Sequence, residues 1–103
     1  MSDSVILTLT APRALEDKLV EALVAHEVAG ADGFTVREVH AYGRSLAFAT
    51  VGEQISGRVR LLELRLVLSA DRARDVVEYL AGLLRGQNVT WQLAPLAAAG
   101  AFA

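Results

Sequence analysis

The chain has 103 residues, no cysteine, and ten basic against twelve acidic side chains, which gives a net charge of −2. This length allows one domain, residues 1–103, and the 53% of hydrophobic residues supply enough apolar surface for a packed core. The composition excludes a disulfide scaffold, a thiolate metal site and thiol catalysis, and the near-neutral charge argues against binding of nucleic acid.

The N-terminus is acidic and leads directly into apolar residues, without the basic lead of a signal peptide. No apolar run approaches the roughly 20 residues that span a bilayer. We therefore expect a cytoplasmic protein that does not insert into a membrane.

Hydrophobic periodicity predicts the first half of the chain. Alternation from Val5 to Thr10 predicts a strand, and Pro12 ends it because its fixed φ and missing N–H suit the start of a helix. Leucines at four-residue spacing then predict one amphipathic helix that continues to Gly30. The β-branched and aromatic residues from Phe34 to Tyr42 predict a second strand.

The second half of the chain is also predicted to form a strand, a helix and a strand. Leucine occupies each even position from 62 to 68, which predicts a third strand between Gly57 and Ser69. Ser69 is expected to cap a second helix, a turn at residues 86–88 ends it, and residues 89–93 form a fourth strand, followed by an alanine-rich tail at 97–103. The order βαββαβ predicts an α+β ferredoxin-like fold, in which two helices cover one face of a four-stranded antiparallel sheet.

The odd positions of the third strand predict an oligomer. They lie on the sheet face away from the helices, which is in water unless another subunit covers it, and they are largely apolar. The residues expected to form this subunit contact are Val59, Leu61, Glu63, Arg65 and Val67. We expect Glu63 and Arg65 to be paired within or across subunits, because an unpaired buried charge costs several kcal/mol.

Catalytic motifs are not found, so we do not expect an enzyme or a cofactor. The predicted central strands contain no aromatic residue on which a base could stack, which argues against RNA recognition. His26, His40 and Glu38 are candidate metal ligands, but the structural interpretation is favoured: His26 ends a helix, where the dipole favours a cation, and His40 is one polar residue on a strand.

The loop at residues 44–56 is too apolar for a solvated linker. Its Thr50-x-x-Glu53 spacing matches a capping box that would start one helical turn ending at Gly57. The loop is expected either to fold onto its own or a neighbouring subunit, or to dock a partner protein. The apolar residues that would do so are Leu46, Phe48, Val51 and Ile55.

Residues 34–44, FTVREVHAYGR, resemble the second-strand motif T-V-x-E-V-x-G-F-G-R of the PII family of trimeric signalling proteins. The similarity continues through residues 58–60 and 64–71, and it is closest to short PII-like proteins often associated with heavy-metal efflux systems. The resemblance implies a homotrimer with effector clefts between subunits, and a T-loop that reports to a partner such as a membrane transporter. It places Thr35, Gly43, Arg44 and Gly86 at the effector cleft.

Two departures from the family concern the ligand. Ala41 replaces the first glycine of G-F-G, and the chain has no Lys or Arg after Arg85, so a triphosphate would lack cationic partners. We therefore expect a compact effector of low charge in place of ATP. The leading function is a PII-like regulatory or sensory protein. The alternatives are a trimeric metal-binding protein similar in fold to the divalent-cation tolerance proteins, and a structural interaction trimer without a ligand.

Overall fold

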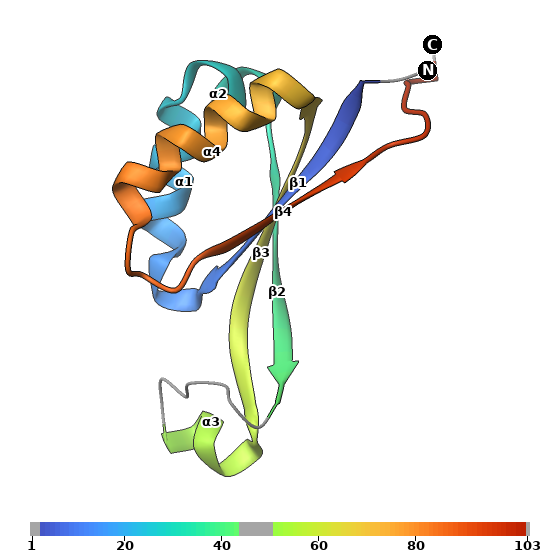
Figure 1. Ribbon diagram of the computed structural model, residues 1–103. Coiled ribbons are helices and arrows are strands. Elements are labelled where there is room, and N and C mark those ends of the chain that lie inside the picture. Colours follow the sequence, from blue (N-terminus) through green and yellow to red (C-terminus); the bar gives the residue numbers. More distant parts are fainter. Residues whose placement is uncertain (1–2, 44–50, 103) are drawn as a thin grey trace.

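The predicted α+β ferredoxin-like fold is confirmed. The computed structural model describes residues 3–43 and 51–102, leaving aside the side chains of Ile55 and Ser56. The sheet has the strand order β2-β3-β1-β4, and each neighbouring pair is antiparallel. Its strands are β1 (Ser4–Pro12), β2 (Thr35–Tyr42), β3 (Arg58–Ser69) and β4 (Thr90–Pro95). The two strands expected at the centre, β1 and β3, lie there (Figure 1).

Helices connect the strands. Between β1 and β2 lie a short 3₁₀ helix η1 (Arg13–Leu15), α1 (Glu16–Ala25) and α2 (Glu27–Asp32), and α4 (Ala70–Leu84) joins β3 to β4. The Ser69 hydroxyl accepts a hydrogen bond from Arg72 N at 3.4 Å, which confirms it as the cap of α4. Figure 1 shows α1, α2 and α4 on the same face of the sheet.

The core lies between these helices and the sheet. The register places Leu7 opposite Leu66 and Leu9 opposite Leu64, so both central strands direct leucine toward the helices. Helix residues such as Leu19 join the same buried cluster. All four even-numbered leucines of β3 are buried, as the alternation predicted.

The prediction of one continuous helix up to Gly30 is wrong. The helix ends at Ala25, and His26 adopts an extended backbone with φ −71° and ψ 132° before α2 begins. The His26 Nδ1 atom accepts hydrogen bonds from Val28 N at 3.2 Å and Ala29 N at 3.3 Å. The imidazole therefore satisfies the free N–H groups at the start of α2, a role that helical periodicity does not indicate.

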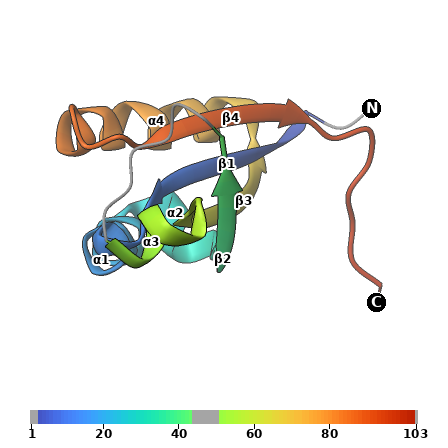
Figure 2. The same cartoon turned by 90° about the horizontal axis from the view of Figure 1, so that it is seen from below.

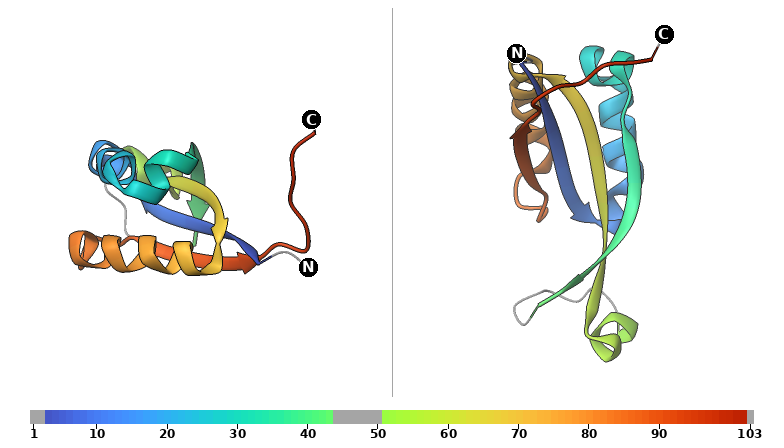
Figure 3. Two further views of the ribbon diagram at one scale, coloured as in Figure 1. Left: turned by 90° about the horizontal axis from the view of Figure 1, so that it is seen from above. Right: turned by 90° about the vertical axis from the view of Figure 1, so that its right-hand side faces the viewer.

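A long two-stranded ribbon extends from one end of the body. β2 and β3 continue beyond the helices, and α3 (Val51–Ser56) lies at the far end of the ribbon (Figures 1 and 3). At the opposite end, residues 96–102 leave β4 and run away from the sheet without forming a helix or strand (Figure 2). None of the helices formed by the described residues is long and apolar enough to cross a bilayer.

Candidate functional site

The residues expected at the effector cleft do not meet within one chain. Thr35 begins β2, and Gly43 follows its last residue at the other end of that strand. Gly86 lies just before β4, which is the opposite edge of the sheet. Arg44 lies outside the described residues. Only a contact between subunits could bring the β2 residues to Gly86.

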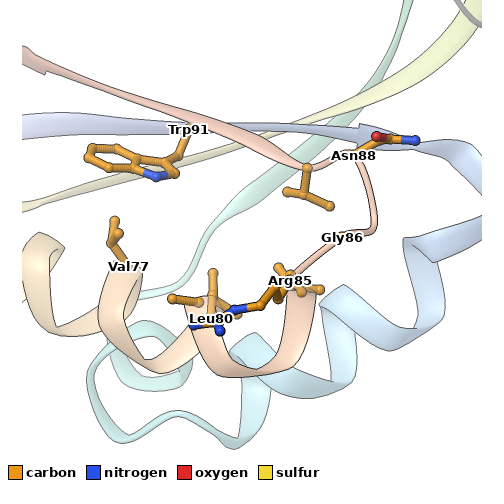
Figure 4. Close-up of a pocket in the computed structure, with 9 residues that line it drawn as sticks. Val77, Leu80, Arg85, Gly86, Asn88 and Trp91 are labelled. Carbon is orange, nitrogen blue, oxygen red and sulfur yellow. The ribbon is translucent and has the colours of Figure 1, made fainter.

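Gly86 does lie beside a pocket. This pocket of about 200 Å³ opens between the C-terminal half of α4 and the start of β4 (Figure 4). Its lining residues are Val77, Leu80, Ala81, Leu84, Arg85, Gly86, Asn88, Val89 and Trp91. Among these described residues, Arg85 has the single ionisable side chain. The pocket is therefore an open groove lined mainly by apolar side chains, with one cationic group.

Trp91 forms the sheet side of the pocket. It pairs with the buried Leu9 of β1, so its indole is on the helix-facing side of the sheet, and Figure 4 shows it across from Val77. Because β4 is an edge strand, Trp91 keeps 53% of its surface exposed. Trp91 was not among the site residues expected from the sequence. The signal that could have found it was a lone tryptophan in the uncharged stretch after Arg85.

The turn between α4 and β4 sets the width of the pocket. Gly86 has φ +76° and Asn88 has φ +59°, both in the left-handed region that glycine and asparagine tolerate best. Gln87 N donates to Leu84 O at 3.1 Å, and Gln87 Nε2 donates to Leu83 O at 3.2 Å, which closes the end of the helix. The chain thus reverses between Arg85 and Trp91 and brings them to one cavity.

The sheet face away from the helices carries an ion pair. Glu63 Oε1 accepts hydrogen bonds from Arg37 Nη2 at 2.7 Å and Arg37 Nε at 3.0 Å, and the two residues are register partners. The structure thus pairs Glu63 within its own chain, with Arg37 of β2, a partner that was not expected from the sequence. Arg65 lies opposite Thr8 and Thr35 and is exposed.

The apolar residues of this face differ in exposure. Val67 is 52% exposed and Leu61 is half-buried, so both are available to a second subunit. Val59 is only 6% exposed in the single chain, where α3 packs against the start of β3. Val59 is therefore covered by its own subunit, although it was expected to be exposed until an oligomer formed.

The described part of the loop at 44–56 is α3. A helix before Gly57 was predicted and is present. Thr50 of the expected capping box, Leu46, Phe48 and the Ile55 side chain lie outside the described part of the chain. Val51 is 71% exposed at the start of the helix, and Glu53 is buried. Glu53 Oε2 accepts a hydrogen bond from Arg60 N at 2.6 Å, which ties α3 to β3.

Of the candidate metal ligands, Glu38 and His40 lie near each other on β2, whereas His26 lies between α1 and α2. Glu38 Oε1 lies 3.7 Å from His40 Nε2, and Glu38 Oε2 lies 3.6 Å from Arg13 Nε. His26 follows the last residue of α1, and its Nδ1 atom is engaged by the N–H groups of Val28 and Ala29. Within residues 3–43 and 51–102, no group of three or more His, Cys, Asp or Glu side chains is placed to hold a metal ion.

Replacing His26 tests this cap. We expect His26→Ala to lower the free energy of unfolding by about 1 kcal/mol, because the N–H groups of Val28 and Ala29 lose their acceptor. His26→Asn should restore most of the loss, since asparagine is a preferred N-cap residue. Urea denaturation followed by circular dichroism gives both values. Equal losses in the two variants would assign the effect to the ring contact with Tyr79, at 4.8 Å between centroids, instead of the cap.

Known proteins share both the family and the fold of this chain. The family model described as a protein of unknown function (DUF3240) matches residues 1–103. The structure is similar to a DUF3240 family protein from Shewanella baltica, with 17% identity, a TM-score of 0.75 and 100% of both chains covered. It is also similar to a candidate PII-like signalling protein from Thermus thermophilus, with 20% identity, a TM-score of 0.61, and 90% of this chain and 86% of the other covered. No curated protein matches the chain. The likeness to the Thermus thermophilus structure shows that the two proteins share a fold, as the sequence resemblance predicted.

Proposed function

The chain belongs to the DUF3240 family, and from its PII-like fold together with the pocket at Gly86 we propose that it is a regulatory protein that senses a small effector. The effector is a compact, largely apolar molecule that carries at most one negative charge. The protein works by binding alone and has no catalytic chemistry. This proposal extends the signalling role in the name of the Thermus thermophilus relative to the present chain.

The observation that carries the proposal is the composition of the pocket. The groove has a volume of about 200 Å³ and is open to solvent, so a compact ligand can enter it without a change in the fold. Val77, Leu80 and Trp91 offer apolar walls, and Arg85 offers one guanidinium for a carboxylate or a similar anion. A compact aromatic monoanion satisfies both features.

The same composition disfavours ATP. A triphosphate needs several cationic or N–H partners, because each uncompensated charge in a partly dry cleft is costly. Among the described residues that line the pocket, Arg85 supplies the one positive charge.

Binding of benzoate tests the proposal, with ATP as the comparison. We expect benzoate to raise the melting temperature and to change the emission of Trp91, the one tryptophan in the chain. At about one hundred times its Kd, a ligand stabilises the folded state by roughly 2.7 kcal/mol. ATP at the same concentration should change neither signal.

The Arg85→Gln variant tests whether the guanidinium charge contributes to the binding of benzoate. It should weaken benzoate about tenfold, because a charge-assisted hydrogen bond is replaced by a neutral one. Benzyl alcohol, which has the same ring without the charge, should bind the variant and the wild type equally. A clear stabilisation by ATP that Arg44→Ala abolishes would contradict the proposal and support a nucleotide-sensing mechanism.

The regulatory unit in this proposal is a homotrimer. Its subunit contact is the sheet face away from the helices, where Leu61 and Val67 remain accessible and the Arg37–Glu63 pair is already satisfied within the chain. The ribbon carries α3 away from the body, which leaves the exposed Val51 available to a partner protein. The effector pocket on α4 and β4 and the partner surface on the ribbon are then separate sites.

A further inference from the structure

We propose that the C-terminal segment of a second copy, residues 96–102, occupies the pocket between α4 and β4, with the Phe102 ring inserted beside Trp91. This inference uses the same pocket as the proposed function, and in it the tail of a second copy competes with the effector for that pocket. It does not depend on the identity of the effector.

The C-terminal segment is apolar and unpartnered. Residues 96–102 read LAAAGAF and contain no charge, and the nearest charged residue before them is Arg85. Phe102 has a relative exposure of 108%, so its ring contacts nothing in its own chain. Figures 1 and 3 show this segment pointing away from the sheet and the helices. Leaving a phenyl ring in water forgoes the largest apolar burial that the segment offers.

The pocket supplies what the segment lacks. Its volume of about 200 Å³ accommodates a phenyl ring, and most of its lining side chains are apolar, such as Val77, Leu80 and Trp91. Trp91 is 53% exposed at the mouth and can stack edge-to-face with a second aromatic ring. The outer side of β4 has no strand partner among the described residues, so the backbone of residues 96–101 can add to this edge as a further strand.

The geometry of the chain favours a second copy over its own tail. Leu96 N donates to Ser4 O at 3.0 Å, so the segment continues along β1 in the direction away from the pocket. The pocket lies at the other end of β4, beside Asn88. The segment bends at Ala97 and then runs away from the sheet, so the same chain would have to reverse its direction to return there. Extended, the segment reaches about 24 Å, far enough to cross a subunit boundary.

This contact joins two different surfaces, a tail and a pocket, and is therefore heterologous. Such contacts close into a ring when the rotation between subunits allows it, and a homotrimer closes after three. Each pocket would then hold the Phe102 of a neighbouring subunit until an effector displaces it. The effector signal would be the release of the tail.

Engineered cysteines test the contact cleanly because the chain has none of its own. The full chain carries Ala81→Cys on the pocket wall and Ala101→Cys beside Phe102, and mild oxidation is followed by non-reducing electrophoresis. We expect covalent dimers and trimers. A disulfide at monomer mass would mean that the tail folds onto its own pocket, and absence of any disulfide would mean that it does not reach the pocket. Either result overturns the inference.

Phe102→Ala in the same double-cysteine chain distinguishes insertion of the Phe102 ring into the pocket from a chance encounter of the two cysteines. We expect the cross-linked fraction to fall about tenfold or more, because the ring supplies most of the apolar burial. Phe102→Leu should retain most of it. An unchanged fraction in Phe102→Ala would contradict insertion of the ring.

Benzoate distinguishes this inference from the proposed function. If the tail competes with the effector, benzoate should bind the Phe102→Ala chain more tightly than the wild type. Equal binding to both, without cross-linking, would overturn the tail contact and leave the proposed effector site intact. If the double-cysteine chain forms cross-links but the Phe102→Ala chain does not bind benzoate, the tail contact is retained and the proposed effector is contradicted.

Discussion

Replacing Gly30 by alanine should lower the free energy of unfolding by about 3 kcal/mol. A Cβ atom at Gly30 of α2 would overlap the carbonyl oxygen of Val24 in α1. The obstacle is backbone, so a rotamer change cannot relieve it, and the two helices would have to separate. Leu23 and Ala29, both fully buried beside this crossing, would lose contacts as well. Urea denaturation of the variant and the wild type measures the loss.

Gly82→Ala is the matched control. Gly82 lies within α4, and a Cβ atom there would have no neighbour within 4 Å. Because alanine is the better helix former, this variant should be more stable than the wild type by about 0.5–1 kcal/mol. The same chemical change is thus expected to have opposite signs at the two positions. A Gly30→Ala variant as stable as the wild type would show that α1 and α2 do not approach so closely.

Val67→Lys should convert the proposed trimer into monomers at micromolar concentration. Val67 is 52% exposed in the single chain, so a lysine at this position can remain solvated and the fold should persist. In a trimer that covers this sheet face, three lysines would be buried, and each unpaired charge costs several kcal/mol. Light scattering gives the mass, and circular dichroism verifies that the variant is folded.

Val24→Lys controls for the added charge. Val24 is 62% exposed on α1, on the helix side of the sheet. This variant should keep the mass of the wild type. A monomeric wild type, or a Val67→Lys variant that remains trimeric, would contradict the proposed subunit contact.

The secondary structure of the sheet was predictable because strand alternation is a local property. Leucine at 62, 64, 66 and 68 defines one buried face over the length of β3, and a shift of register by one residue would place all of these side chains in water. Ser69 and the residues before Gly57 likewise act on backbone groups a few positions away. The βαββαβ order then left few ways to bury both helices on one face of the sheet.

The break at His26 was not predictable from periodicity. His26 follows Leu23 by three residues and so stays on the helix face of Leu15, Leu19 and Leu23, and the pattern favours one helix. The chain breaks there because the His26 Nδ1 atom accepts from the first N–H groups of α2, while Gly30 allows α2 to approach Val24. Both effects depend on the path of the backbone, which the spacing of apolar residues does not encode.

The pocket is a property of the tertiary structure alone. The resemblance to the PII family indicated Gly86, and the residue types indicated the lack of basic residues after Arg85, which predicted the low charge of the expected effector. They did not indicate Trp91, because a tryptophan on a strand is ordinarily interpreted as core. Only the strand order, with β4 at the edge, leaves its indole half exposed against α4 and places it across a cavity from Val77. Alternation and capping act between neighbours along the chain, whereas a cavity depends on how separate elements pack against one another.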